Sequence, residues 1–162
     1  MWWHIFALNY RIMASIGEEI KQSKFKSEYN KLLINVLFTN SWINGLQGQV
    51  FKGHGLTPQQ YNTLRILRGQ LPESASVNLL KDRMIDKMSN VSRIIDKLKA
   101  KDLVTRKPCK HDRRQVDVKI TQKGLDLLEL ISGEMETWET QLHTITEEEA
   151  ATVNNLLDKW RA

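Results

Sequence analysis

Apolar and polar positions recur with a helical period along most of the chain and with a strand period in one short part of it. From residue 26 to residue 52, apolar side chains return every three or four positions, which predicts one long amphipathic helix. Leu33, Leu37 and Phe38 make its apolar stripe broader than a surface helix needs. The glycines at 53 and 55 predict where this helix ends.

Two shorter helices are expected next. Thr57 followed by proline is a strong start signal, with Thr57 as the N-cap, and this helix should stop near Gly69. Ser74 or Ser76 then opens a short helix that reaches Met84, and a turn leads out of it. The pattern therefore predicts two helices in close succession before the basic centre of the chain.

The period changes within residues 86–121. A stripe at i, i+3, i+4 and i+7 predicts an amphipathic helix with Ser89 or Asn90 as its N-cap. A strand pattern follows, Pro108 ends it, and alternating residues from Val116 to Ile120 predict a returning strand. The tip between the strands is a charged loop. The apolar stripe of the helix consists of Val91, Ile94, Ile95 and Leu98.

Two more helices are predicted after the hairpin. Thr121 can cap the first, and its apolar residues follow spacings of 3, 4, 3 and 4, a coiled-coil-like seam that needs a partner. The chain's own first helix could supply that partner. Thr146 and Glu149 form a capping box that starts the last helix. The seam consists of Leu128, Ile131, Met135, Trp138 and Leu142.

This order of elements, together with several short motifs, resembles the winged helix-turn-helix of the MarR (multiple antibiotic resistance regulator) family. The resemblance covers roughly residues 30 to 160, and the Asp-x-Arg of the wing with its trailing Thr-x-x-Gly is its most diagnostic part. The motifs are Gly55-Leu56-Thr57, Gln60-Tyr61 and Leu64, Val91-Ser92-Arg93 and Leu98, Leu103-Val104-x-Arg106, and Asp112-x-Arg114 with Val118-x-Ile120-Thr121-x-x-Gly124.

One residue departs from the family pattern. The family has glycine just before the Leu-Val that opens the wing, in the left-handed conformation that ends the recognition helix, and this chain has Asp102. Aspartate tolerates that conformation better than most residues, so a small energetic cost is expected and the fold is retained.

The resemblance implies a mainly α fold with a small β-hairpin wing, a winged helix-turn-helix joined to a helical dimerisation region. The chain would work as a homodimer. The expected divisions are residues 1–25 as an N-terminal extension, 26–55 as the first dimerisation helix, 56–121 as the DNA-binding lobe, and 122–162 as the C-terminal dimerisation helices.

Charge is strongly segregated along the chain, although the net charge is only +5. Residues 81–123 hold 14 Lys and Arg against 6 Asp and Glu, while residues 124–162 hold 2 against 9. Such a distribution lets one surface approach phosphates while another stays away from them. It favours double-stranded DNA as the partner.

The N-terminus and the single cysteine leave alternatives open. Met1 to Met13 is apolar and aromatic, but it is too short to span a bilayer and has no basic n-region. It is either an extra helical segment or an upstream extension whose functional start is Met13. With only Cys109, no intramolecular disulfide can form. A cytoplasmic protein with no membrane association is expected.

No constellation for catalysis, metal or cofactor binding is present in the sequence. It has no glycine-rich phosphate loop and no paired metal ligands, and its four histidines are widely separated. Cys109 lies beside Lys107, Lys110 and His111, whose positive charge could make it reactive, but filling the hairpin is the simpler role. We therefore expect a protein that is not an enzyme and needs no cofactor.

The DNA-contacting residues can be divided by their chemistry. The start of the recognition helix should face the major groove, with Arg93 suited to guanine and Asn90 to adenine. By the resemblance, Arg114 enters the minor groove and Asp112 holds it through a charge-assisted hydrogen bond. The major-groove set is Ser89, Asn90, Ser92, Arg93 and Lys97, and the phosphate contacts are Lys107, Lys110 and Arg113.

The resulting hypothesis is a transcriptional regulator, a repressor by preference, that binds pseudo-palindromic operators. The resemblance adds a small aromatic or anionic effector that releases the DNA, with Asn40, Trp42 and Tyr61 as candidate contacts; a core or interface role is the simpler explanation for Trp42. The main alternative is a winged-helix module that binds a protein partner and no DNA.

Overall fold

The computed structural model describes residues 14–109, 116–140 and 142–162. The chain divides into two compact units, one up to Leu46 and one from Gln47 onwards.

The N-terminal unit consists of a short helix and most of a long one. Helix α1 (Ile16–Glu19) begins at Ser15, whose backbone N–H donates to Glu18 Oε2 at 2.6 Å. Helix α2 (Glu28–Gly53) confirms the long helix predicted over residues 26–52. Its first half exposes large apolar side chains, including Tyr29 and Leu37, and only its last turns are buried, at Val50 and Phe51.

Capping side chains define the next three helices. Helix α3 (Pro58–Arg68) starts at Thr57 and ends at Gly69, as predicted. Helix α4 (Val77–Arg83) starts at Ser76, whose hydroxyl accepts the Leu79 N–H at 3.1 Å, so the structure selects Ser76 over Ser74. Helix α5 (Val91–Lys99) starts at Asn90, whose side chain accepts the Arg93 N–H at 3.1 Å.

The sheet is small and antiparallel, in the order β1-β3-β2. Strands β2 (Val104–Pro108) and β3 (Val116–Ile120) confirm the predicted hairpin, in a register that pairs Val104 with Ile120. Strand β1 (Ala75–Ser76) was not predicted. A two-residue strand has no periodicity to detect, and it exists because Ala75 pairs with Val118 on the far side of β3.

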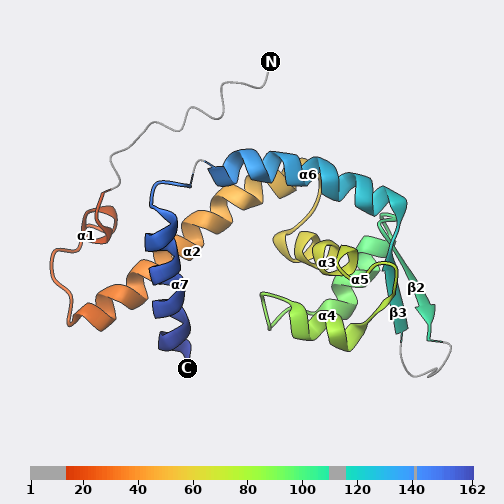
Figure 1. Ribbon diagram of the computed structural model, residues 1–162, viewed down its shortest axis with the longest axis horizontal. Helices are drawn as coiled ribbons and strands as arrows, with labels where there is room; N and C mark the ends of the chain where they lie inside the picture. Colours follow the sequence, from red (N-terminus) through yellow and green to blue (C-terminus); the bar gives the residue numbers. More distant parts are fainter. Residues whose placement is uncertain (1–13, 110–115, 141) are drawn as a thin grey trace, which may run out of the picture. The chain divides into compact units, whose positions relative to one another are not determined.

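A single apolar core holds the C-terminal unit together. In Figure 1, α3, α4 and α5 lie beside the hairpin, and their inner faces meet it and helix α6 (Gln122–Thr140). Burial of these side chains fixes α5 against the rest of the lobe and leaves its other face outside. The side chains with no exposed surface include Leu64, Leu80, Ile95, Leu98, Val118, Leu128 and Ile131.

Two residues shape the connections of the wing, one between α5 and β2 and one between β3 and α6. Asp102 has φ = +59°, which confirms that it takes the left-handed position of the family's glycine. Gly124 packs so closely that a Cβ there would lie 2.4 Å from the carbonyl oxygen of Leu103. The Thr-x-x-Gly motif thus has a steric reason, since the first turn of α6 rests on the backbone that opens the wing.

The seam predicted along α6 is corrected in two respects. Leu128 and Ile131 are buried in the core of the lobe, so the lobe itself satisfies the first half of the seam. Helix α6 ends at Thr140, and the N–H of Leu142 bonds the Glu139 carbonyl as part of a turn, so Leu142 does not continue the helix.

The last helix, α7 (Glu147–Arg161), has the predicted capping box. The backbone N–H of Thr146 donates to Glu149 Oε2 at 2.8 Å, and the Glu149 N–H donates back to the Thr146 hydroxyl at 3.2 Å. None of the residues of α7 is buried. Within the described ranges, no helix combines the length and the apolar character needed to cross a bilayer.

Candidate nucleic-acid interface

Helix α5 separates its side chains by chemistry. Val91, Ile95 and Leu98 point into the core with at most 4% of their surface exposed. Ser92, Arg93 and Lys97, from the predicted DNA-binding set, are exposed. Helix α5 therefore presents hydroxyl, guanidinium and ammonium groups to solvent, while its buried apolar residues hold it against the core of the lobe.

Asn90 is exposed and has a structural task in addition to its predicted one. Its Oδ1 accepts the N–H of Arg93. This N–H is one of the groups at the start of α5 that have no partner within the helix. An amide oxygen has two lone pairs and the amide nitrogen has two hydrogens, so a bidentate contact to adenine remains chemically open. Its orientation would be set by the cap.

A shallow pocket of about 360 Å³ lies where α3 begins and α5 begins. It brings Ser89, Asn90, Arg93 and Lys97 together, four of the five residues predicted for the major groove. The hydroxyl oxygen of Ser89 is itself buried, so it is not available to a base edge in this conformation. The other residues lining the pocket are Thr57, Gln59, Gln60, Asp86 and Ile94.

Asp86 organises the turn that leads into α5. Its Oδ1 accepts the Met88 N–H at 3.0 Å, and its backbone carbonyl accepts the Ser89 N–H at 3.2 Å. The neighbouring Ser89 hydroxyl and the Met88 N–H lower the pKa of the Asp86 carboxyl below its ordinary value. The carboxylate therefore stays ionised at neutral pH and keeps the turn in place.

The wing can be described only in part. Lys107 lies exposed on β2, as expected for a phosphate contact. The other predicted wing residues, Lys110, Asp112, Arg113 and Arg114, lie outside the described residues. Cys109, at the edge of this segment, is a half-buried free thiol.

An ion pair that sequence reasoning missed joins the wing to α5. Arg106 on β2 donates to Asp96 on α5, with Nη1 and Oδ1 2.6 Å apart, and both side chains keep part of their surface exposed. Arg106 was noted only as a motif residue, and nothing in the spacing of ten residues signals the contact. The pair limits how far the hairpin can move relative to α5.

Several lysines in the basic segment already serve the protein. Lys119 Nζ donates to the Pro72 carbonyl at 2.6 Å, Lys123 Nζ donates to the Lys101 carbonyl at 2.9 Å, and Lys101 donates to the Gly55 carbonyl. These contacts hold loops to the lobe. Part of the basic segment of residues 81–123 thus also fixes the scaffold.

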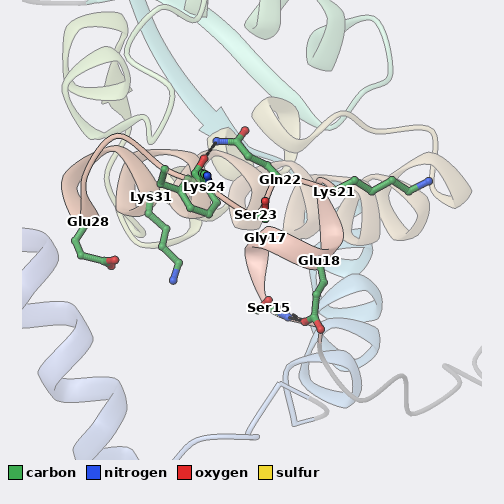
Figure 2. Close-up of a pocket in the computed structure, with 10 residues that line it drawn as sticks. Ser15, Gly17, Glu18, Lys21, Gln22, Ser23, Lys24, Glu28 and Lys31 are labelled. Atoms are coloured by element: carbon green, nitrogen blue, oxygen red, sulfur yellow. Dashed lines mark hydrogen bonds between the residues drawn. The ribbon is translucent and has the colours of Figure 1, made fainter.

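The larger cavity, about 810 Å³, belongs to the N-terminal unit and is lined by residues between Ser15 and Lys31. Lys31 Nζ lies 5.8 Å from the ring centroid of Phe25, a cation–π contact that engages its charge. In Figure 2 the side chains of Lys21 and Glu28 point away from each other. These groups do not converge on a common point, so the cavity does not form a ligand site of the usual kind.

The three candidate effector contacts lie in different surroundings. Asn40 and Trp42 belong to the N-terminal unit, where the Asn40 side chain accepts a bond from Asn44 at 3.2 Å and Trp42 is 36% exposed. Tyr61 belongs to the C-terminal unit, where it is buried and stacks on Phe51 with ring centroids 4.5 Å apart. Tyr61 is thus first of all a core residue.

Known proteins share this fold and much of this sequence pattern. The model of the MarR family matches residues 54–115. The HTH-type transcriptional regulator MhqR of Bacillus subtilis (strain 168) is 26% identical over 120 residues, which cover 72% of this chain and 80% of MhqR. A MarR transcription factor from Planctomyces limnophilus is 29% identical, with a TM-score of 0.64 over 83% of this chain and 98% of that one.

A DNA complex is among the similar structures. The complex of Staphylococcus aureus MepR with DNA matches with a TM-score of 0.71 at 20% identity, over 85% of this chain and 96% of MepR, which at that identity shows the shared fold. The wing that opens with a left-handed residue, the packed helix α5 and these matches agree: residues 54–115 match the MarR family, and the chain shares the fold of its transcriptional regulators.

Proposed function

We propose that this protein is a sequence-specific DNA-binding repressor that acts as a homodimer on pseudo-palindromic operators. The observation that carries the proposal is helix α5. Val91, Ile95 and Leu98 are buried on its apolar side, while Ser92, Arg93 and Lys97 are exposed on a helix that Asn90 caps. A helix held in this way can enter a major groove with little loss of backbone freedom.

The proposed division of contacts keeps the roles expected from the sequence. Arg93 reads guanine and Asn90, oriented by its cap, reads adenine. Lys107 contacts the phosphate backbone, and the wing residues Lys110, Asp112, Arg113 and Arg114 keep the roles expected from the sequence. Much of the affinity then comes from counterion release, so it should fall steeply as salt rises. The fold shared with MepR, which has been crystallised with DNA, supports this arrangement.

The homodimer is supported by apolar surface that the single chain leaves exposed. Val153, Leu156 and Trp160 on α7 are 48%, 60% and 42% exposed. Leu33 and Leu37 on the first half of α2 are exposed as well. Two copies joined through these helices would present two α5 helices about one helical turn apart, roughly 34 Å, as an operator with two half-sites requires.

Release by a small aromatic or anionic effector completes the proposal. Trp42 offers an accessible aromatic surface for such a molecule, whereas Asn40, two residues away on the same helix, projects from a different side of it. The dimer would have two states, one with its α5 helices spaced to fit the operator and one with a different spacing. A ligand that prefers the second state weakens DNA binding, and the size of the effect is set by the difference in its affinity for the two states. Trp42→Ala should then abolish release by an effector while operator affinity stays within about twofold.

The decisive test is selection of binding sites from a random duplex pool at moderate salt. A pseudo-palindrome with half-sites about one helical turn apart would support the dimeric reader. If nothing is enriched, the selection is repeated at low salt. Weak binding without sequence preference there would indicate an architectural role, and no binding at all would favour the protein-partner alternative. With the operator placed across a promoter, a repressor lowers transcription and an activator raises it.

A further inference from the structure

Two nearly fully exposed apolar side chains occupy the turn between α4 and α5. Met88 is 93% exposed and Ile85 is 86% exposed, more than any other large hydrophobic residue in the part of the chain that the structure describes. The core does not use either side chain. Because exposed apolar surface is unfavourable in water, a turn that keeps both outside calls for a reason beyond folding.

The turn is held in one conformation by hydrogen bonds from both sides. The Ile85 N–H donates to the Asn62 side chain at 3.1 Å, which fixes the start of the turn to α3. The Met88 N–H donates to the Asp86 carboxylate at 3.0 Å, and Lys87 Nζ donates to the Asp82 carbonyl. The backbone that carries Met88 is therefore ordered before any partner binds, and its side chain projects from a fixed point.

The surroundings indicate which partner this side chain meets. Met88 lies two residues before Asn90, the N-cap of α5, and is therefore next to the N-terminus of the helix that is proposed to enter the groove. The stretch before it, residues 81–87, carries three exposed basic side chains, Lys81, Arg83 and Lys87, against two exposed acidic ones, Asp82 and Asp86, and Asp86 is already held by the Met88 N–H. This setting fits a polyanion that continues past the start of α5.

The major groove offers one apolar feature, the 5-methyl group of thymine, and apolar side chains recognise thymine through it. Methionine suits such a contact, since it is long, unbranched and polarizable. We infer that Met88 is a specificity-determining residue that contacts the methyl group of a thymine in each operator half-site. The inference rests on the proposed operator binding.

Replacing thymine by deoxyuridine removes that methyl group and changes nothing else in the base pair. In the selected operator, each thymine is replaced in turn, and affinity is measured for the full-length protein and for Met88→Ala. The unaltered protein should lose about fourfold at one thymine in each half-site, the factor expected for one buried carbon. Met88→Ala should bind the thymine and deoxyuridine duplexes equally well at that position.

Ile85→Ala is the matched control, because it truncates an equally exposed apolar side chain in the same turn. It should keep the full thymine dependence. The inference is overturned if Met88→Ala retains that dependence, if Ile85→Ala loses it instead, or if no thymine position matters. It is also overturned if Met88→Ala reduces binding to anionic phosphatidylserine vesicles and leaves the thymine dependence intact.

The two proposals fail separately. An operator that is bound tightly but shows no thymine dependence through Met88 leaves the proposed function intact and removes only this residue assignment. Failure to bind any operator overturns both.

Discussion

Helices α5 and α7 have the same kind of pattern in the sequence, a stripe of apolar residues beside a polar face, and opposite positions in the structure. The stripe of α5 is buried in its own lobe, with Ile95 and Leu98 at 0% exposure. The stripe of α7 stays outside, with Leu156 60% exposed. Periodicity shows that a helix has two faces, but which face is free for function depends on what the rest of the chain covers.

In α5 the covered face is the apolar one, so its polar face is left for DNA. In α7 the apolar face remains, and a second copy of the chain is the partner proposed for it. In the proposed function, the two helices divide the protein's work between recognition of the operator and assembly. Substitutions in the two stripes should have different consequences, which allows the comparison to be tested.

The largest effect on folding is expected for Ile95→Ala. A fully buried isoleucine that is cut to alanine leaves a cavity, at a cost of about 2 to 5 kcal/mol in the free energy of unfolding. Leu156→Ala should cost less than about 1 kcal/mol within one chain, because that side chain is mostly exposed already. Urea unfolding at two protein concentrations checks both values. An equal loss for the two variants would contradict the distinction.

Assembly should respond in the opposite way. Leu156→Asp places a charge in the proposed contact between copies, so the protein should sediment as a monomer at micromolar concentration. Operator affinity should fall by about a hundredfold or more, since one half-site then binds without the other. Asn155→Asp on the opposite side of α7 adds the same charge and should change neither property. A dimeric Leu156→Asp would remove α7 from the proposed interface.

The sequence predicted most of the fold and less of the site, for physical reasons. Helices with strong caps, such as those at Thr57 and Thr146, could be found because their signals are local. Strand β1 could not, since it depends on pairing with β3 across forty residues. The same holds for the Arg106–Asp96 ion pair, and for the burial of the Ser89 hydroxyl and of Tyr61. These features are decided by tertiary contacts.

Recognition itself should show a smaller and more selective effect. Arg93→Ala removes one base contact from the face of α5 and should cost about 1 to 3 kcal/mol at one base pair of the operator. Arg114→Ala, in the wing, should weaken all sequences about equally and reduce the salt dependence of binding. Competition binding against single-base operator variants separates the two. Equal losses on operator and random DNA for Arg93→Ala would defeat its assignment.

The smallest effects concern the start of α7. Thr146→Ala removes the cap hydroxyl and should destabilise this helix by about 1 kcal/mol, which weakens assembly and leaves the lobe unchanged. Circular dichroism and sedimentation at neutral pH measure both. The backbone N–H and the hydroxyl of Thr146 lower the pKa of Glu149 below its ordinary value. Stabilisation by the charged carboxylate is therefore fully present above that ordinary value and is lost as the pH falls through the lowered one.

Assembly should consequently be constant near neutral pH and weaken in acid, from about pH 4.5 downwards. Glu149→Gln keeps the size of the side chain and cannot titrate. The weakening of assembly in acid that comes from Glu149 should therefore disappear in that variant. Asp86 has a lowered pKa in the turn before α5 and provides the counterpart, since its titration should loosen the recognition turn and not the assembly. Sedimentation reports assembly alone, so Glu149→Gln should remove its share of the acid loss there, while operator binding, which also needs the recognition turn, should keep the share that comes from Asp86. If Glu149→Gln removed the whole acid loss of operator binding as well, the titration of Asp86 would have no part in it.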